Sequence, residues 1–301
     1  MSASPRKARK PSQSLARPKN QKRQTPVGLS VRCWGVRGSV PAPGGTTAKY
    51  GGNTPCVEVR CGGERLIFDL GTGARALGEH NAGAPMTGHI FCTHYHYDHL
   101  QGLPFFAPVF DPRSRFTIMG PTRNGRTVKD VLVGQMQQPY FPVTAEMVFR
   151  AQLDYRPFAE GDRHPVGEAM VTAIEVNHPG GNLSYRVDYR GKAVVFATDH
   201  EHGTDRDQQL EKFARGADVV IYDAMYSEDE YRGHAGAPKI GWGHSTWQQA
   251  AKFADAAQVK QLLLFHHDPT RSDAALDAIV KQVKRLRPDA IGAREGQTIT
   301  L

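Results

Sequence analysis

Short apolar or alternating segments, separated by turns rich in glycine and proline, dominate the chain from residue 27 onward. Alternation of apolar and polar side chains is typical of strands with one buried face, and continuously apolar segments are typical of strands covered on both faces. We therefore predict strands at 30–35, 56–61, 65–70, 89–93, 115–120, 147–155, 169–176, 183–189, 192–198, 218–224 and 261–266.

Helical patterns are fewer, and they are predicted at 127–137, 246–257 and 274–287. The last two follow serine, threonine or aspartate residues that can cap a first turn, and the third ends before Pro288. The strands form two long sets, each followed by helical sequence. An α/β protein with two sheets packed face to face and helices outside is therefore expected.

The 301 residues suit one large domain as well as two, and they include 38 basic and 30 acidic side chains. Residues 1–26 hold no acidic residue, and their basic ones are Arg6, Lys7, Arg9, Lys10, Arg17, Lys19, Lys22 and Arg23. Removing these eight from 38 leaves 30 basic against 30 acidic side chains. We predict a disordered basic tail at 1–26, with binding to a polyanion such as nucleic acid as the alternative, and a neutral domain at 27–301.

Four cysteines are too few for a disulfide scaffold and show no CxxC spacing, which favours a reducing compartment. No segment approaches the roughly 18 consecutive apolar residues of a membrane span. No apolar signal segment follows Met1. We therefore expect a cytoplasmic protein with no membrane partner.

The segment HYHYDH, residues 94–99, directly follows a predicted strand. In an extended chain, residues i and i+2 point the same way, so His94 and His96 can hold one ion. Asp98 and His99 lie where the chain must turn, and they can face a second ion about 3.5–4 Å away. Buried imidazole and carboxylate groups are costly unless they are paired, and a metal satisfies them. The sequence therefore predicts a metal site here.

Residues of the ligand type recur at the ends of three other predicted strands. His178, Asp199 and His266 each stand at or just after the carboxyl end of an apolar strand. A rigid scaffold presents a site in this way. The repeated arrangement predicts that these three side chains join the group at 94–99.

HYHYDH resembles the HxHxDH signature of the metallo-β-lactamase fold. The ordered set of Asp69, residues 94–99, His178, Asp199 and His266 looks like the sequential ligand motifs of that superfamily. The resemblance covers the chain from about residue 29 onward and implies an αββα four-layer sandwich. The segments that resemble its phosphodiesterase-like members, near cyclic-phosphate phosphodiesterases and ribonuclease Z, are GVRGSVPAPG, YGGNTPC, QGLPFF, NHPGG, ATDHEH, GWGHSTW and LFHHDP.

The resemblance also implies which residues hold two divalent metal ions. The implied ligands are His94, His96 and His178 for the first ion, Asp98, His99 and His266 for the second, and Asp199 as the bridge between them. Asp69 would orient a ligand loop. Five imidazoles and two carboxylates suit Zn²⁺, Mn²⁺ or Fe better than Mg²⁺ or Ca²⁺, and zinc is the first choice.

The GHST segment resembles a ribonuclease Z element whose histidine assists phosphodiester cleavage, which makes His244 the candidate proton donor. In that family the histidine pairs with the glutamate of an HEAT segment, and here Asp223 replaces this glutamate and Tyr222 replaces the histidine before it. Asp98, His244 and Asp223 are thus the candidate catalytic residues. Hydroxide held between the metals would attack phosphorus, and His244 would protonate the leaving alkoxide.

A bridging Asp199 and the GHST segment favour a phosphodiester substrate by resemblance. A small, cyclic nucleotide-type ester is expected, because the body is neutral and residues 100–163 show no obvious insertion for gripping tRNA. The alternatives are a ribonuclease Z-like nuclease that uses the basic tail, a non-catalytic metal-binding regulatory protein, and a thioester or β-lactam hydrolase. Relatives are often dimers, so a homodimer is a further expectation.

Two other features flank the metal motif. Arg37, in the segment GVRGS, is a candidate clamp for a phosphate. Tyr95, Tyr97, Phe105 and Phe106 are candidates for stacking a base, and core packing is the alternative for at least two of them.

Overall fold

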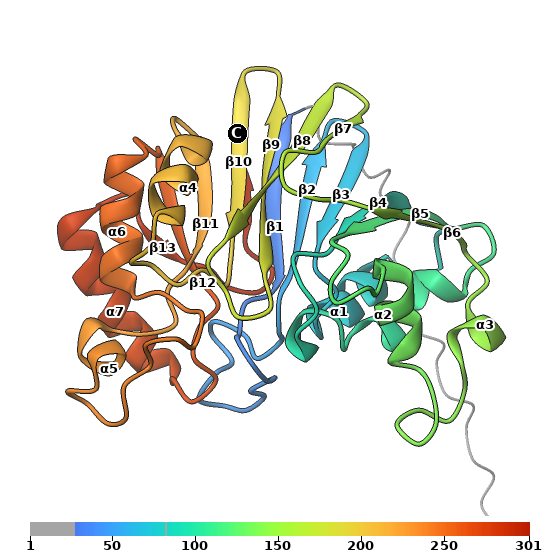
Figure 1. The fold of residues 1–301 in the computed structure, drawn as a ribbon, viewed down its shortest axis with the longest axis horizontal. Coiled ribbons are helices and arrows are strands. Elements are labelled where there is room, and N and C mark those ends of the chain that lie inside the picture. The colour runs from blue at the N-terminus through green and yellow to red at the C-terminus, as the bar shows by residue number, and fades with distance from the viewer. Residues whose placement is uncertain (1–27, 82) are drawn as a thin grey trace, which may run out of the picture.

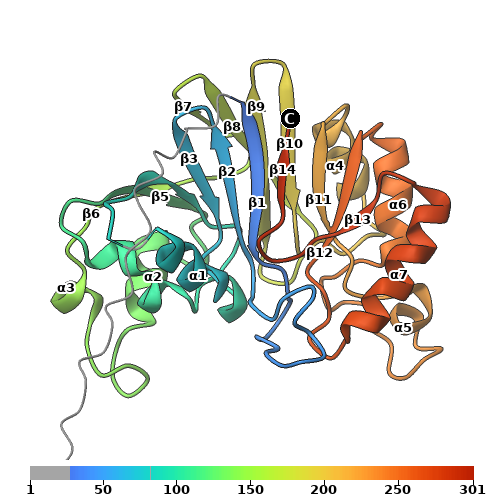
Figure 2. The same ribbon diagram turned by 180° about the vertical axis from the view of Figure 1, so that it is seen from behind.

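The computed structural model describes residues 28–81 and 83–301. The tail predicted at 1–26 lies outside the described residues. Two seven-stranded sheets pack face to face, and helices cover the outer face of each (Figures 1 and 2). The predicted αββα four-layer sandwich is confirmed.

The first sheet places the carboxyl ends of β3 and β4 at one edge, because β3, β4, β5 and β6 run parallel. Its strands, in spatial order, are β14 (Thr298–Thr300), β1 (Leu29–Gly35), β2 (Cys56–Cys61), β3 (Glu64–Phe68), β4 (Thr87–Phe91), β5 (Arg115–Gly120) and β6 (Gln152–Pro157).

The second sheet also gathers several carboxyl ends at one edge. β10, β11 and β12 run parallel, and β8 shares their direction because it pairs antiparallel with β9, which pairs antiparallel with β10. Its strands, in spatial order, are β13 (Ile291–Gly292), β12 (Gln261–Phe265), β11 (Val219–Asp223), β10 (Lys192–Ala197), β9 (Asn182–Tyr189), β8 (Ala169–Val176) and β7 (Arg163–Val166).

The helices form the two outer layers (Figure 1). On the side of the first sheet they are α1 (Gly73–His80), α2 (Val128–Gly134) and α3 (Ala145–Val148), with short 3₁₀ turns at Tyr97–His99, Leu103–Phe105 and Ala107–Phe110. On the side of the second sheet they are α4 (Arg206–Ala214), α5 (Glu228–Arg232), α6 (Trp247–Ala256) and α7 (Asp273–Leu286). No helix within residues 28–81 and 83–301 is long and apolar enough to cross a membrane.

Three apolar cores fill the three interfaces between the four layers. In β10, Val194 and Phe196 lie between the sheets, whereas Val195 and Ala197 lie in the core with the residues of α4 and α6. Successive side chains of a strand point to opposite faces, so a strand buried on both sides must be apolar throughout. All four cysteines are buried and free.

The helices predicted at 246–257 and 274–287 are confirmed, each within one residue. The helix predicted at 127–137 ends earlier, at Gly134. The strand predicted at 147–155 begins only at Gln152, because its first residues belong to the short helix α3. Helices α1 and α4 and the short helix α5 were not predicted.

The misses at α1 and α4 have physical reasons. Gly73 in the first turn of α1 suggests a loop, but a Cβ there would lie 2.6 Å from the backbone nitrogen of Gly35. The glycine thus lets α1 approach β1 closely. Helix α4 lacks a clear apolar stripe, since among its residues only Leu210 and Ala214 are buried.

Two hydrogen bonds tie the second sheet to the chain that follows β4. The wholly buried Tyr185 in β9 donates its hydroxyl to the carbonyl of Cys92 at 2.7 Å. Leu183 donates its backbone N–H to the carbonyl of Thr93 at 3.1 Å. These contacts fix the start of the HYHYDH loop relative to the other sheet.

We expect Tyr185→Phe to lower the free energy of unfolding by about 1–3 kcal/mol, because it leaves the buried carbonyl of Cys92 without this donor. Urea unfolding followed by circular dichroism measures the change. Tyr189→Phe is the matched control on the same strand, since among the described residues the Tyr189 hydroxyl has no hydrogen-bond partner. Equal losses in the two variants would contradict the role given to the Tyr185 hydroxyl.

Candidate metal centre

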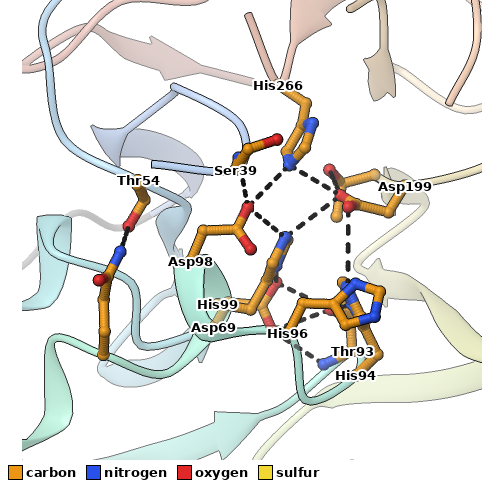
Figure 3. Close-up of polar contacts among 12 residues, drawn as sticks. Ser39, Thr54, Asp69, Thr93, His94, His96, Asp98, His99, Asp199 and His266 are labelled. Atoms are coloured by element: carbon orange, nitrogen blue, oxygen red, sulfur yellow. Dashed lines mark hydrogen bonds and ion pairs between the residues drawn. The ribbon is translucent and has the colours of Figure 1, made fainter. Parts of the chain in front are cut away.

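Asp69, directly after β3, holds the HYHYDH loop against the end of its own sheet (Figure 3). Its Oδ1 accepts the backbone N–H of Thr93 at 2.8 Å, and its Oδ2 lies 2.8 Å from Nδ1 of His99. Because Nδ1 of His99 is bonded to this carboxylate, Nε2 is left to face the centre. Asp69 thus occupies the orienting position that the resemblance implied.

His94, His96 and His178 form the first cluster, which joins the loop after β4 to the end of β8. Nδ1 of His96 lies 3.0 Å from Nε2 of His94 and 3.1 Å from Nε2 of His178. Nδ1 of His178 donates to the carbonyl of Gly243 at 2.8 Å, so Nε2 carries the lone pair of the neutral ring. Burial lowers the pKa of His178 to about 4, which keeps this ring neutral near pH 7.

Asp98, His99, Asp199 and His266 form the second cluster, and all four side chains are buried. Oδ2 of Asp98 lies 3.2 Å from Nε2 of His266 and 3.3 Å from Nε2 of His99. Oδ1 of Asp199 lies 3.3 Å from both of these nitrogens. Figure 3 shows the two carboxylates and the two rings facing one another.

Asp199 is shared between the clusters. Its Oδ2 lies 3.7 Å from Nε2 of His94, on the side of the first cluster, while Oδ1 faces the second. Burial acts to raise the pKa of Asp199, but the imidazoles of His266 and His99 outweigh it and hold the pKa well below its usual range. Asp199 is therefore an ionised carboxylate with one oxygen toward each cluster, as a bridging ligand requires.

These donor atoms fit two divalent cations. Within each cluster the ligand atoms lie within 4.8 Å of one another. Lone pairs that face one another, as in the first cluster, repel unless a cation lies between them. Nε2 of His99 is buried 3.3 Å from the carboxylates of Asp98 and Asp199, but among the described residues it makes no well-oriented hydrogen bond, which buried polar atoms normally do. Imidazole and carboxylate together are ligands of zinc, manganese and iron.

The charge of the second cluster also fits a cation. Burial lowers the pKa of His99, but the carboxylates of Asp199, Asp98 and Asp69 outweigh burial and raise it well above its ordinary value. Without a cation, a proton on His99 therefore supplies positive charge to these carboxylates. A divalent cation would displace that proton and take its place.

Three residues of the site have a left-handed backbone. The φ angles of Asp69, Asp199 and His266 are 61°, 52° and 56°. This conformation costs about 1–2 kcal/mol for a residue other than glycine. All three follow the ends of strands, and each tight turn directs the carboxylate or the ring into the site: Asp69 toward His99, and Asp199 and His266 toward the second cluster. Strain of this kind persists where the surroundings impose it, and it is common at functional sites.

His244 and Asp223, which the sequence suggested as partners, lie together beside the second cluster. Nδ1 of His244 is 2.8 Å from Oδ2 of Asp223, the last residue of β11, and 3.9 Å from Oδ2 of Asp199. Burial acts to lower the pKa of His244, but Asp223, followed by Asp199 and Asp98, raises it to about 9. The ring therefore carries a proton on each nitrogen near pH 7.

Glu201 is a functional candidate that the sequence analysis missed. Its buried carboxylate accepts the Tyr231 hydroxyl at 2.8 Å and the backbone N–H groups of Gly241 and Gly243 at 2.6 and 2.7 Å. It thereby fixes the loop that leads to His244 and that presents the Gly243 carbonyl to the first cluster. The signal available in the sequence was an acidic residue two positions after Asp199, in a segment already quoted for its likeness to the family.

Gly243 itself is required by this packing. Its φ is 86°, and a Cβ at this position would lie 2.2 Å from Nδ1 of His178. Any side chain would displace the candidate ligand ring.

Arg37 does not reach the site. Its guanidinium is wholly buried and donates to the carbonyls of Gly51, at 2.8 Å, and Arg271, at 2.7 Å. The prediction that Arg37 clamps a phosphate is therefore wrong, because the side chain joins backbone loops inside the protein.

The clusters open into a pocket of about 360 Å³. Its lining consists of Ser39, Tyr95, His96, Tyr97, Asp98, Asp199, His244 and His266. The backbone N–H of Ser39 donates to Oδ2 of Asp98 at 2.7 Å. Candidate ligands and candidate proton donor therefore share one chamber that a small molecule can enter.

The chain is similar to curated proteins and to solved structures. Ribonuclease Z of Pyrococcus furiosus is 25% identical, over 81% of this chain and 89% of that protein. Ribonuclease Z of Lachnoclostridium phytofermentans is 24% identical, over 91% and 98%. Among solved structures, the short form of human tRNase Z has a TM-score of 0.64 with 20% identity, and it covers 90% of this chain and 98% of that one.

A diphosphatase from the PhnP family has a TM-score of 0.67 with 17% identity, over 91% of this chain and 98% of that one. Identities this low show the fold alone. The model of the Beta-lactamase superfamily domain matches residues 65–267, which is more than half of the chain. The chain therefore belongs to the beta-lactamase superfamily, and it is a metal-dependent hydrolase of the metallo-β-lactamase fold.

Proposed function

We propose that the protein is a phosphodiesterase with a two-cation centre, acting on a small nucleotide-type phosphodiester, with cyclic esters as the first candidates. The observation that carries the proposal is the position of Asp199, which has one oxygen toward each cluster and lies 3.9 Å from His244. The proposed ligands are His94, His96 and His178 for one cation, Asp98, His99 and His266 for the other, and Asp199 for both. Zinc is the first choice, with manganese or iron as alternatives.

When bound, the two cations would supply a nucleophilic water at neutral pH and neutralise charge on the phosphate oxygens. The chain itself contributes the proton donor. Asp223 holds Nδ1 of His244 and stabilises the imidazolium, which leaves the Nε2 proton for the oxygen that departs from phosphorus. The N–H of Ser39 donates to Oδ2 of Asp98 and so helps to hold this proposed ligand in position.

Three observations support a phosphodiester. The curated relatives are ribonuclease Z enzymes, and the linkage that a ribonuclease cleaves in RNA is a phosphodiester. Yeast PDE1 shares the fold, with a TM-score of 0.60 and 12% identity. The pocket of about 360 Å³ is within the range for small ligands, and the charges of residues 27–301 balance, so nothing in this part requires a large polyanion.

The second candidate is a ribonuclease Z-like nuclease. It is favoured by the identity to ribonuclease Z relatives and by the eight basic residues in 1–26, which lie outside the described residues.

Turnover of a phosphodiester would exclude the non-catalytic regulatory role. Assays with thioester and cephalosporin substrates test the remaining alternative, a thioester or β-lactam hydrolase. A cytoplasmic location and a homodimer stay predictions.

We expect the wild-type protein to bind about two transition-metal ions per chain and the double variant His94→Ala/Asp98→Ala to lose both, because each cluster loses a ligand. Hydrolysis of bis(p-nitrophenyl) phosphate should then fall at least roughly a hundredfold. Inductively coupled plasma mass spectrometry measures the metal, and His234→Ala, at an exposed histidine outside both clusters, is the control. Full activity in the double variant would refute the proposed ligands.

We expect His244→Ala to reduce kcat roughly 10²–10⁴-fold on adenosine 3′,5′-cyclic monophosphate, whose leaving alkoxide needs a proton. The loss on bis(p-nitrophenyl) phosphate should be much smaller, because p-nitrophenolate leaves without one. Asp223→Asn should show the same contrast more weakly, since it retains the ring but not the charge that stabilises it. Steady-state kinetics on the two substrates measures this contrast. Equal losses on both would argue that His244 acts by position and not as an acid.

Deletion of residues 1–26 separates the two candidate functions. If the protein acts on small esters, kcat/KM for the cyclic nucleotide should change less than about twofold. A nuclease that relies on the basic tail should instead lose affinity for RNA, together with much of the salt dependence of binding. Fluorescence anisotropy with a labelled RNA, at several salt concentrations, gives the second measurement.

A further inference from the structure

A second pocket, of about 470 Å³, opens beside the metal pocket. Tyr95 and Tyr97 line both pockets. The remaining walls of the second pocket come from Leu100 and from the segment around α2, which lies on the first-sheet side of the molecule (Figure 1). A ligand whose phosphate lies at the metal centre therefore has room to extend past Tyr97 into the second pocket.

The aromatic walls of this second pocket are unusually exposed. The fractional exposure is 77% for Tyr97 and 82% for Tyr140. Phe106, in contrast, is wholly buried, so the four aromatic residues near the metal motif divide into core and surface roles. The Tyr95 hydroxyl donates to the carbonyl of Pro121, which fixes that ring in the wall. Exposed rings such as those of Tyr97 and Tyr140 contribute little to the core and present faces on which a planar ligand can stack.

Two exposed polar side chains of the second pocket make no direct bond to protein groups that the structure describes. Among the described residues, the guanidinium of Arg126 and the side-chain amide of Gln137 make no hydrogen bond or ion pair. Their polar neighbours are already engaged. Asp130 caps the first turn of α2, and Gln135 donates its amide to the carbonyl of Leu132 at 3.1 Å. The pocket thus keeps the Arg126 guanidinium and the Gln137 amide available to a ligand beside the exposed rings.

We propose that the second pocket binds the nucleobase of the substrate, stacked against Tyr97 and Tyr140, with its polar edge toward Arg126 and Gln137. The proposal rests on the proposed function and narrows it to phosphodiesters that carry a base on one side of the phosphate. Stacking on aromatic side chains tolerates any base, and amide and guanidinium groups pair with the donors and acceptors of base edges.

Two substrates with the same leaving group test this proposal. They are the p-nitrophenyl ester of thymidine 5′-monophosphate and methyl p-nitrophenyl phosphate, which has no base. We expect the wild-type protein, loaded with zinc or manganese, to prefer the thymidine ester, and Tyr140→Ala to reduce the ratio of the two kcat/KM values roughly tenfold. Tyr140→Phe, which retains the ring, should keep the ratio. Phe110→Ala removes an exposed ring that lines neither pocket, and it should keep the ratio too.

Direct binding gives a readout that does not depend on turnover. Isothermal titration calorimetry with thymidine 5′-monophosphate should show roughly tenfold weaker binding to Tyr140→Ala and unchanged binding to Phe110→Ala. If the wild-type protein hydrolyses neither ester, the proposed function fails. If it hydrolyses both, but Tyr140→Ala leaves the ratio and the binding unchanged or slows both esters equally, the nucleobase pocket is overturned while the phosphodiesterase proposal stands.

Discussion

The backbone turn that carries Asp199 is held by a buried amide, and the relation between the two clusters depends on this contact. The wholly buried Asn182 donates from Nδ2 to the carbonyls of Thr198, at 2.7 Å, and Asp199, at 2.8 Å. The Thr198 hydroxyl donates to Oδ1 of Asp199 at 2.6 Å. These bonds stabilise the left-handed turn and hold the Asp199 carboxylate through Oδ1. The position of the Asp199 carboxylate between the clusters is therefore set by hydrogen bonds of the chain, and binding of the proposed cations need not reorganise it.

The two clusters meet only because strands of both sheets end at the same edge of the sandwich. The first sheet contributes Asp69 and residues 94–99 from the ends of β3 and β4. The second sheet contributes its site residues from the ends of β8, β10, β11 and β12. The centre therefore spans the interface between the sheets, and the apolar core below it determines the distance between the donor sets. The bond from Tyr185 to Cys92 connects the two parts directly beneath the centre.

The sequence predicted the layers and the donor set because both depend on local patterns. Strand periodicity and ligand residues at strand ends are visible within a few positions, whereas the pairing of His244 with Asp223 needed the family resemblance. The roles of Glu201 and Arg37 could not be predicted from local patterns. Both side chains bind backbone groups of loops that are distant in the sequence, and no pattern of side chains reports such contacts. Helix α1 was missed because the glycine that lets it approach β1 also resembles a turn.

In the proposed function, chemistry and substrate choice reside in different parts of this architecture. The proposed ligands stand at strand ends, where strained turns and buried carboxylates fix them, so a small change at Asn182 or Glu201 would affect every substrate alike. The second pocket is formed largely by the segment 126–140, which contains α2 and surface loop, and loops accept substitutions that a sheet does not. Residues such as Arg126 and Tyr140 can therefore change which ester is accepted without moving the donor atoms. A single metal scaffold can in this way serve different phosphodiesters.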